Sequence, residues 1–368
     1  SLFSGYVPAE WTHGQPLHIS RAVALLAMAI AVPGALAAAA FGAWRGLATA
    51  SVQEALHEGG RSASRRSGRL GRGLVIAQMA LATCLMCGAG LFLHALYDAA
   101  RTPLGFASDH ILTFDLAPVH GGNPNASTRD LVQRLLQNLH AVPGVGRVAV
   151  TNGLPAGGFE QQFNMGGVHL PGRGYLHPSP QIRGVSSEFF SVFHIPVREG
   201  RSFDATDVAG GEPVAIVNQT LADRQYEGHA VGREIVVNDY SGYPGGKAMA
   251  DDPTMHPVTA RIVGVVGDTR QFGPLDSVKR EFLYLPLAQM PEHIVQVFRS
   301  YQPLRFALRV HGDPNRYRQA VHAAVAAVAP DQPIATVSTM DDIVRATTGN
   351  TRRDLFLIGL FALVALGL

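Results

Sequence analysis

Three uncharged hydrophobic runs divide this chain and restrict its possible folds more than any other feature. Residues 22–44 and 73–97 are each longer than twenty residues and contain no Asp, Glu, Lys or Arg. A bilayer core of about 30 Å requires about 20 apolar residues of helix, so both runs predict membrane-spanning helices. The third run, residues 355–368, has 14 residues and reaches only about 21 Å as a helix. We therefore expect it to begin a helix that continues in a longer protein.

The distribution of charge predicts which side of the membrane each segment occupies. Residues 45–72 carry six arginines and two acidic residues, whereas residues 98–354 carry 23 basic and 25 acidic residues. Short basic loops remain in the cytoplasm, and large domains cross largely regardless of their charge. The predicted order is an extracytoplasmic loop (1–20), a transmembrane helix (21–44), a cytoplasmic basic loop (45–72), a transmembrane helix (73–97), an extracytoplasmic domain (98–350) and the truncated start of a third helix (355–368).

Two local features have both a chemical and a structural interpretation. Cys84 and Cys87 have the spacing of a redox pair, but they lie inside the second hydrophobic run, so we expect them to pack as small apolar residues. The basic loop at 45–72 could bind nucleic acid. Because it lies between two predicted spans, we interpret it as a topology determinant that contacts anionic lipid.

The large domain has the pattern of two strand–helix–strand units around a β-rich middle. Strands are expected at 111–116, 148–151, 304–310 and 334–337, with an amphipathic helix at 127–140, a helical stripe at 317–328 and a final helix at 340–347. The middle predicts strands at 181–185, 214–217, 234–237, 261–266 and 282–285, short helices at 187–193 and 219–226, and an irregular surface loop at 239–257. The two outer units are expected to pair in one subdomain. The predicted class is α+β, with two βαβ units bracketing a β-rich insertion, flanked by transmembrane α-helices.

No stretch of the sequence carries the residues of a catalytic or cofactor site. Lys247 is followed by alanine instead of the hydroxyl residue of a phosphate loop, and residues 184–188 lack the last glycine of a nucleophile elbow. The fifteen histidines show no metal-binding spacing. We expect four of them to be solvated (His169, His177, His229 and His256), and Asp341 with Asp342 to favour a helix start. The prediction is no catalytic, cofactor-binding or metal-binding residue, no cofactor and no enzymatic activity.

Several segments together resemble the MacB/FtsX-like ABC transporter permeases. Residues 52–61 and 69–91 are similar to the cytoplasmic lead-in and first span of that family. Residues 103–114, 185–201, 213–222, 262–270 and 282–289 resemble its periplasmic core domain, and residues 333–344 with 355–368 resemble its return to the membrane. The additional span at 22–44 resembles the duplicated permeases, in which two such units are fused.

The resemblance implies a permease subunit in a bacterial inner membrane, with its large domain in the periplasm or extracytoplasmic space. Such a subunit passes motion from a separate cytoplasmic ABC ATPase to the outer domain, in efflux or in lipoprotein or peptide handling. The segments implied to carry the motion are residues 73–101 and 340–368. The other implied partners are membrane lipid and a second copy or the other half of a duplicated chain, with no nucleic acid.

Two other classes of protein share parts of this pattern. A membrane sensor receptor also places an extracytoplasmic ligand-binding domain between two spans, but it continues into a signalling helix or kinase. A membrane-anchored hydrolase requires a convergent acid–base or metal constellation, which the sequence lacks. The sensor receptor therefore remains the alternative to the permease.

Overall fold

The computed structural model describes residues 101–118, 127–158, 167–242, 247–251, 256–274, 276 and 278–347, together with selected positions between Ile76 and Asp98. The chain divides into two compact units, Ser1–Leu81 and Ala82–Leu368, and the elements named below belong to the second. The segments predicted at 1–72 and 355–368 lie outside the described residues. The described positions between Ile76 and Asp98 are helical and exposed. Within the described part of the chain, no helix has both the length and the apolar character needed to cross a membrane.

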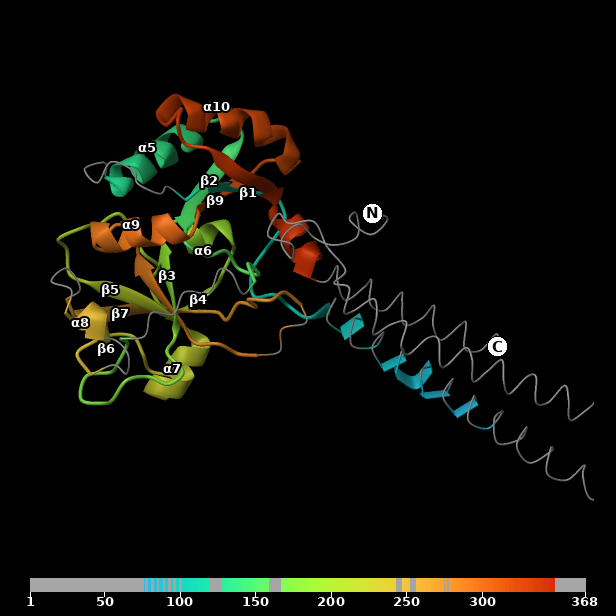
Figure 1. The fold of residues 1–368 in the computed structure, drawn as a ribbon, viewed down its shortest axis with the longest axis horizontal. Helices are drawn as coiled ribbons and strands as arrows, with labels where there is room; N and C mark the ends of the chain where they lie inside the picture. The colour runs from blue at the N-terminus through green and yellow to red at the C-terminus, as the bar shows by residue number, and fades with distance from the viewer. Residues whose placement is uncertain are drawn as a thin grey trace, which may run out of the picture. The chain divides into compact units, whose positions relative to one another are not determined.

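Ten strands form one mixed sheet (Figure 1). They are β1 (Ile111–Leu116), β2 (Val145–Thr151), β3 (Gln181–Val185), β4 (Val197–Gly200), β5 (Val214–Asn218), β6 (Glu234–Val237), β7 (Val258–Val266), β8 (Phe282–Pro286), β9 (Leu304–Val310) and β10 (Ile334–Thr339). Their order is β10-β1-β9-β2-β3-β8-β5-β7-β4, with β6 paired to β7 outside this path. The β-rich insertion thus extends the sheet that the outer strands begin.

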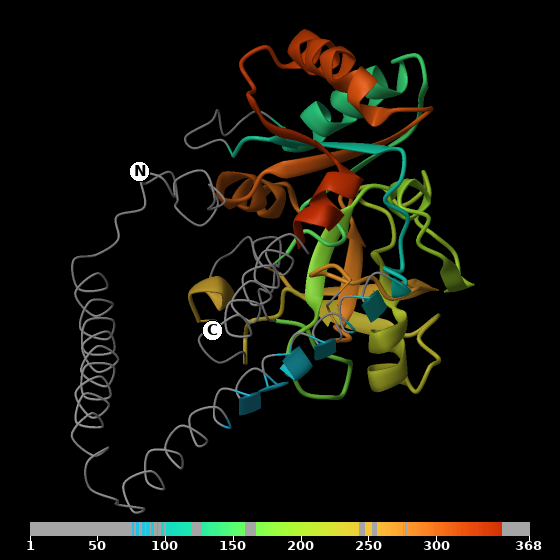
Figure 2. The same ribbon diagram turned by 90° about the vertical axis from the view of Figure 1, so that its right-hand side faces the viewer.

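The two strand–helix–strand units pair in one half of the sheet, as the sequence predicts, and the structure adds that their strands interlock. Strand β9 lies between β1 and β2 and is antiparallel to both, and β1 lies between β9 and β10 in the same way. Each unit therefore places a strand between the two strands of the other. Helices α5 (Thr128–His140) and α10 (Arg318–Val328) connect the strands of the two units and lie side by side over this half (Figure 2).

The remaining helices are short, and four of them follow strands of the insertion, whereas the 3₁₀ turn and the last helix follow β9 and β10. They are α6 (Phe189–Val192), α7 (Gln219–Tyr226), α8 (Lys247–Ala250), α9 (Glu292–Tyr301), the 3₁₀ turn η2 (Pro314–Tyr317) and a helix at residues 340–347. Asp313 caps η2 and Pro314 takes its first position. The Ser127 hydroxyl caps α5 by accepting from Asp130 N, which confirms the start of that helix.

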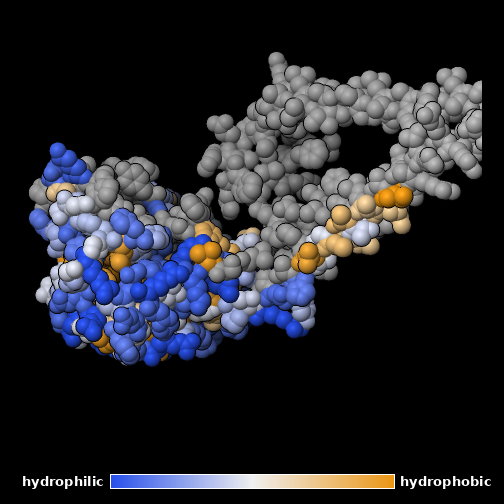
Figure 3. All heavy atoms as spheres, turned by 90° about the horizontal axis from the view of Figure 1, so that it is seen from below, coloured by the Kyte–Doolittle hydropathy of each residue, from blue (hydrophilic) through white to orange (hydrophobic). Residues whose placement is uncertain are grey.

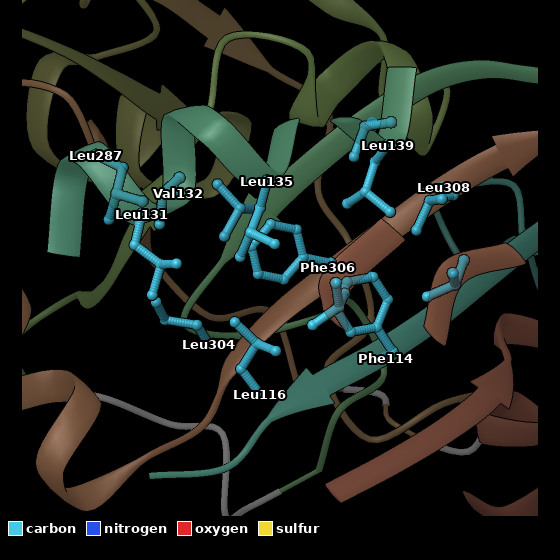
Figure 4. Close-up of a cluster of buried hydrophobic side chains, with 14 of the residues drawn as sticks. Phe114, Leu116, Leu131, Val132, Leu135, Leu139, Leu287, Leu304, Phe306 and Leu308 are labelled. Carbon is cyan, nitrogen blue, oxygen red and sulfur yellow. The ribbon is translucent and has the colours of Figure 1, made fainter. Parts of the chain in front are cut away.

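The core lies on both faces of the sheet because successive side chains of a strand point to opposite faces. Phe114 of β1 and Phe306 of β9 stack at 4.8 Å between ring centroids and pack under α5 (Figure 4). Alternate residues of the same strands, such as Ile111 and Ala307, belong to a second cluster with α6 on the opposite face. A third cluster packs β5, β6 and β7 against α7. Both faces of the sheet are therefore covered.

The two halves of the sheet meet at a narrow joint between β2 and β3. Only the pair Thr151 and Val185 is in register there. The next residue, Asn152, donates from its backbone to Gly184 O at 3.3 Å and accepts from Gly184 N at 3.0 Å through its side chain. From the first half, the Arg305 guanidinium donates to Asn152 O at 2.8 Å. Asn152 therefore helps to hold the joint, together with Ser186, which donates from its backbone to Val150 O at 3.0 Å.

The structure corrects some of the predicted elements. Strand β2 begins at Val145 instead of at residue 148, and the irregular loop at 239–257 contains one helical turn, α8. Helix α9 and strand β4 were not predicted at all. Strand β4 has four exposed residues at the edge of the sheet, so it lacks the alternation of a half-buried strand.

Candidate functional site

One loop contacts both the segment through which the chain enters the domain and the segment through which it leaves. This loop, residues 268–274, follows β7 and is called the junction loop here. On the entering side, Arg270 donates from its backbone to Leu104 O at 3.0 Å and from Nε to Pro103 O at 3.2 Å. On the leaving side, Gly273 lies against Thr347, at the end of the 340–347 helix. The junction loop is therefore placed to couple the two segments.

Glycine is required at both contacts of the junction. Gly105 has a φ of +82°, and a Cβ added to it would overlap the carbonyl oxygen of Asp268. Gly273 has a φ of +80°, and a Cβ added to it would overlap the Thr347 hydroxyl. Residues with a side chain rarely adopt this conformation. The close approach of all three segments thus depends on two missing side chains.

The start of the junction loop is fixed to α7 by a partly buried polar network. The Asp268 carboxylate accepts from Asn218 Nδ2 at 2.6 Å and from the Thr220 backbone and hydroxyl at 2.9 and 2.7 Å. Asn218 is also the N-cap of α7, accepting from Leu221 N. An acidic group at a helix N-terminus satisfies free N–H groups and interacts favourably with the helix dipole. A movement of the loop would therefore be transmitted to α7.

The middle of the loop reaches the buried charge of Arg183 on β3. Gln271, which is 1% exposed, donates to Gly158 O at 3.0 Å and accepts from the Arg183 guanidinium. Arg183 is 2% exposed and lies 4.7 Å over the Phe282 ring. Burial lowers the pKa of Arg183 to about 10, because a low-dielectric environment disfavours the charged form. The guanidinium is still charged at neutral pH.

Asp276 and Arg280 hold the far end of the loop. The Asp276 carboxylate accepts from Arg280 Nη1 at 2.5 Å and from the backbone of Phe272 and Val278 at 3.2 Å each. Burial alone would raise the pKa of Asp276, but these hydrogen bonds and the Arg280 charge hold it below its ordinary value. Arg270 also donates to Asp276 O. Two arginines thus hold Asp276 in place: Arg270 donates to its carbonyl oxygen and Arg280 to its carboxylate.

The leaving helix begins where the acidic pair was predicted to favour a helix start. The Thr339 hydroxyl accepts from Asp342 N at 3.1 Å, which caps the helix, and donates to the Asp342 carboxylate at 2.7 Å. Asp341 accepts from the Ser108 hydroxyl at 2.5 Å, so it ties the entering segment to the leaving helix. The acidic pair therefore has a structural role at the junction.

The residues considered as chemical candidates either have structural partners or are exposed. Ser186, in the rejected nucleophile elbow, accepts from Val150 N at 3.1 Å. His177, His229 and His256 are exposed, as predicted. The prediction for His169 was wrong: its side chain is 19% exposed and lies 2.9 Å from Asp239 Oδ2. Among the described residues, no group of three or more His, Cys, Asp or Glu could hold a metal ion.

Sequence reasoning did not identify the junction loop, although its residues follow a predicted strand. The contacts between Arg270 and Pro103 join positions 167 residues apart, and no local pattern encodes such a contact. The available signal was Gly273 followed by Pro274 after a buried strand, which indicates a fixed turn. The junction loop is joined to three segments by hydrogen bonds and close packing, so it can transmit displacement between them.

The sequence matches the MacB-like periplasmic core domain family over residues 73–350. The periplasmic region of MacB from Actinobacillus actinomycetemcomitans is 12% identical, covers 67% of this chain and 96% of its own, and gives a TM-score of 0.42. A domain of a permease protein from Porphyromonas gingivalis is 13% identical, with coverage of 64% and 92% and a TM-score of 0.38. The extracellular domain of the noncanonic ABC-type transporter YknZ from Gram-positive bacteria is 14% identical, with coverage of 61% and 100% and a TM-score of 0.35. Comparison with curated proteins found no match. Because the family match spans more than half of the sequence, the chain belongs to the family of MacB-like periplasmic core domains.

Proposed function

We propose that this chain is the permease subunit of an ABC-type transporter, and that it passes motion from a separate cytoplasmic ATPase to its outer domain. The junction loop carries this proposal. Its Arg270 holds the entering segment at Pro103 and Leu104, and its Gly273 packs on the leaving helix. A relative displacement of those two segments would reach the sheet through Gln271 and α7 through Asp268.

The helical positions that precede the domain support a membrane anchor. Large apolar side chains are exposed there (Ile76, Met79, Met86, Leu91 and Tyr97), and Figure 3 shows orange, hydrophobic surface along the described part of this segment. Exposed apolar surface of this kind marks contact with a partner or a membrane. We propose spans at 21–44 and 73–97 and the start of another at 355–368, in a bacterial inner membrane with residues 98–350 outside.

The subunit itself is proposed to be non-catalytic, with ATP hydrolysis in the cytoplasmic partner. The incomplete phosphate loop around Lys247 supports this assignment, as does the lack, among the described residues, of a His, Cys, Asp or Glu group that could hold a metal ion. Efflux, or the handling of lipoproteins or peptides, is the proposed transport class. Membrane lipid and a second copy or the other half of a duplicated chain complete the proposed partners.

Reconstitution of the full-length protein with its ABC ATPase tests this function. A fluorophore at Gln133→Cys, on the exposed face of α5, is attached after Cys84 and Cys87 are changed to serine. ATP should change its signal in the parent protein. Arg270→Ala should reduce this response about tenfold while ATP hydrolysis continues, because it removes side-chain hydrogen bonds worth about 1 kcal/mol or more each.

The matched control is Arg173→Ala. Arg173 is exposed, is far from the junction loop in sequence, and donates to Gln225 O at 3.4 Å. This variant should respond to ATP like the parent protein. The proposal is wrong if no ATPase is recruited by the full-length protein, or if both variants keep the ATP response unchanged.

A further inference from the structure

A basic surface with an apolar tip follows directly after the junction loop. It consists of Val278, Lys279 and Arg280, together with Arg224 of α7, and is called the basic tip here. Val278 is 59% exposed, and it is one of the few large apolar side chains that the described residues leave exposed outside the 76–97 helix. These residues line a pocket of about 320 Å³ with Pro178, Ser179, Gln181 and Glu281.

The acidic partners of the basic tip point inward, so its outer charge is positive. The Arg280 guanidinium is paired with Asp276, whose side chain is 4% exposed. Arg224 lies 3.6 Å from Glu281, whose side chain is 9% exposed, while the Arg224 side chain is 54% exposed. Lys279 is exposed as well. An anion approaching from solvent therefore meets the basic groups before the carboxylates.

The contacts of the junction loop place the basic tip close to the end of the proposed span, so this inference depends on the proposed function. The last apolar residue of the run is Tyr97, and Arg101 lies over its ring at 4.1 Å. Pro103, which contacts Arg270, is six residues further on. Six residues span at most about 20 Å even when the chain is extended, and each headgroup layer is about 5–8 Å thick. The basic tip continues from the same loop and so lies next to the headgroup region.

We propose that the basic tip docks on the phosphate groups of anionic phospholipids in the outer leaflet, with the Val278 side chain inserted between headgroups. Basic residues beside an exposed apolar side chain are the combination that binds anionic membrane surfaces. Free phosphate would use Arg224 and Lys279 but would gain nothing from Val278. The exposed Val278 side chain therefore favours a lipid surface as the source of the phosphate.

Docking would hold the junction loop against the membrane while the two anchored segments move. Asp276 accepts from Val278 N and from Arg280, and Arg270 donates to Asp276 O. The lipid contact and the junction thus share one carboxylate. A lipid-bound tip gives the loop a fixed reference point, so displacement of the anchored segments would act on the sheet instead of tilting the whole domain.

A fluorescence experiment on the full chain in nanodiscs tests the proposal. With Cys84 and Cys87 changed to serine, an environment-sensitive probe is attached at Val278→Cys, and nanodiscs contain either phosphatidylglycerol or phosphatidylcholine. The probe should shift to the blue in phosphatidylglycerol and remain water-like in phosphatidylcholine. Inorganic phosphate at a concentration equal to that of the lipid should not reverse the shift.

Two probe positions separate failure of this inference from failure of the proposed function. Leu91→Cys, on the proposed span, should be shifted to the blue in both lipids, and Val208→Cys, in a loop where Val208 is 50% exposed, should be water-like in both. A water-like probe at 278 with a buried probe at 91 overturns the lipid contact alone. A water-like probe at 91 overturns the membrane placement and the lipid contact together.

The charge variants test the part that the basic residues play. In phosphatidylglycerol, Arg224→Gln and Lys279→Gln should each lower the ratio of buried to exposed probe about fivefold. Arg173→Gln, which removes an exposed arginine outside the basic tip, should leave the ratio unchanged. An equal shift in both lipids, an unchanged ratio in both charge variants, or reversal of the shift by inorganic phosphate would contradict docking on anionic lipid.

Discussion

Arg183 places a guanidinium inside the domain, where it contacts Gln271 and the ring of Phe282. Its Nη1 has no hydrogen-bond partner among the described residues. A buried cation without a close carboxylate is costly, because desolvation is repaid only by good partners. Arg183 therefore makes its contact with the junction loop at a cost to the stability of the fold.

Replacing Arg183 should separate the effect of its charge from the effect of its volume. Arg183→Met should keep the free energy of unfolding within about 1 kcal/mol of the parent protein, because it removes the desolvation cost and retains most of the volume. Arg183→Ala should lose about 2–4 kcal/mol through the cavity it leaves. Thermal unfolding of the full chain in detergent measures both, and equal losses in the two variants would show that the charge stabilises the fold.

The sequence predicted the behaviour of single residues well only where their neighbours in the chain decide it. Ser127 caps the helix that was predicted to begin there. His169 was expected to be solvated, but it pairs with Asp239, which lies 70 residues further along the chain. Its environment depends on the pairing of distant segments, which a local pattern does not contain.

At the scale of elements, helix α5 is completed by a residue of α9. The Glu292 carboxylate accepts from Thr128 N at 2.6 Å and from the Ser127 hydroxyl at 3.4 Å. The first N–H groups of a helix have no partner within the helix. Glu292 therefore satisfies a free donor of α5 and joins two helices on the same face of the sheet.

Removing this carboxylate should loosen the start of α5. Glu292→Ala should cost about 1–2 kcal/mol and speed hydrogen exchange in the first turn of α5. Gln133→Ala, on the exposed face of the same helix, should leave that turn protected. Hydrogen exchange followed by mass spectrometry measures both variants, and equal protection of the first turn in the two would contradict the cap.

The elements with a clear period were predicted nearly to the residue, including β1, β3, β6, β9 and α7. Helix α9 was missed even though Ile294 and Val295 are buried in the core. Its apolar residues pack beside α5, so their pattern makes sense only once both helices lie over the same sheet. A helix or strand could thus be predicted where its own hydrophobic period marks the face that packs on the core.

At the scale of the molecule, the sheet depends on the narrow joint at Asn152. Asn152 is 2% exposed, and it connects Gly184 of the second half to Arg305 of the first. Removing the Asn152 side chain would leave the buried N–H of Gly184 without its acceptor, and an unsatisfied buried group of this kind costs about 1–3 kcal/mol. The joint is therefore the place where the two halves would separate first.

Asn152→Ala should weaken the joint without disturbing either half. The backbone amide of Gly184 should exchange faster, while amides between β1 and β9 keep their protection, because local openings draw on the least stabilised contacts. The control is Asn315→Ala, which changes an exposed asparagine in η2. Faster exchange across both halves, or none at Gly184, would show that Asn152 does not hold the joint.

The sequence by itself determined most of the helices and strands, the pairing of the two outer units in one subdomain and the family resemblance, because hydrophobic period, capping and the order of segments can be read along the chain. Only the tertiary structure decided the sheet order across the insertion, the burial of Arg183 and the junction loop. These depend on contacts such as those between Arg270 and Pro103, which lie 167 residues apart. Packing selects such contacts collectively, when both faces of the sheet are covered, and no single segment of the chain specifies them.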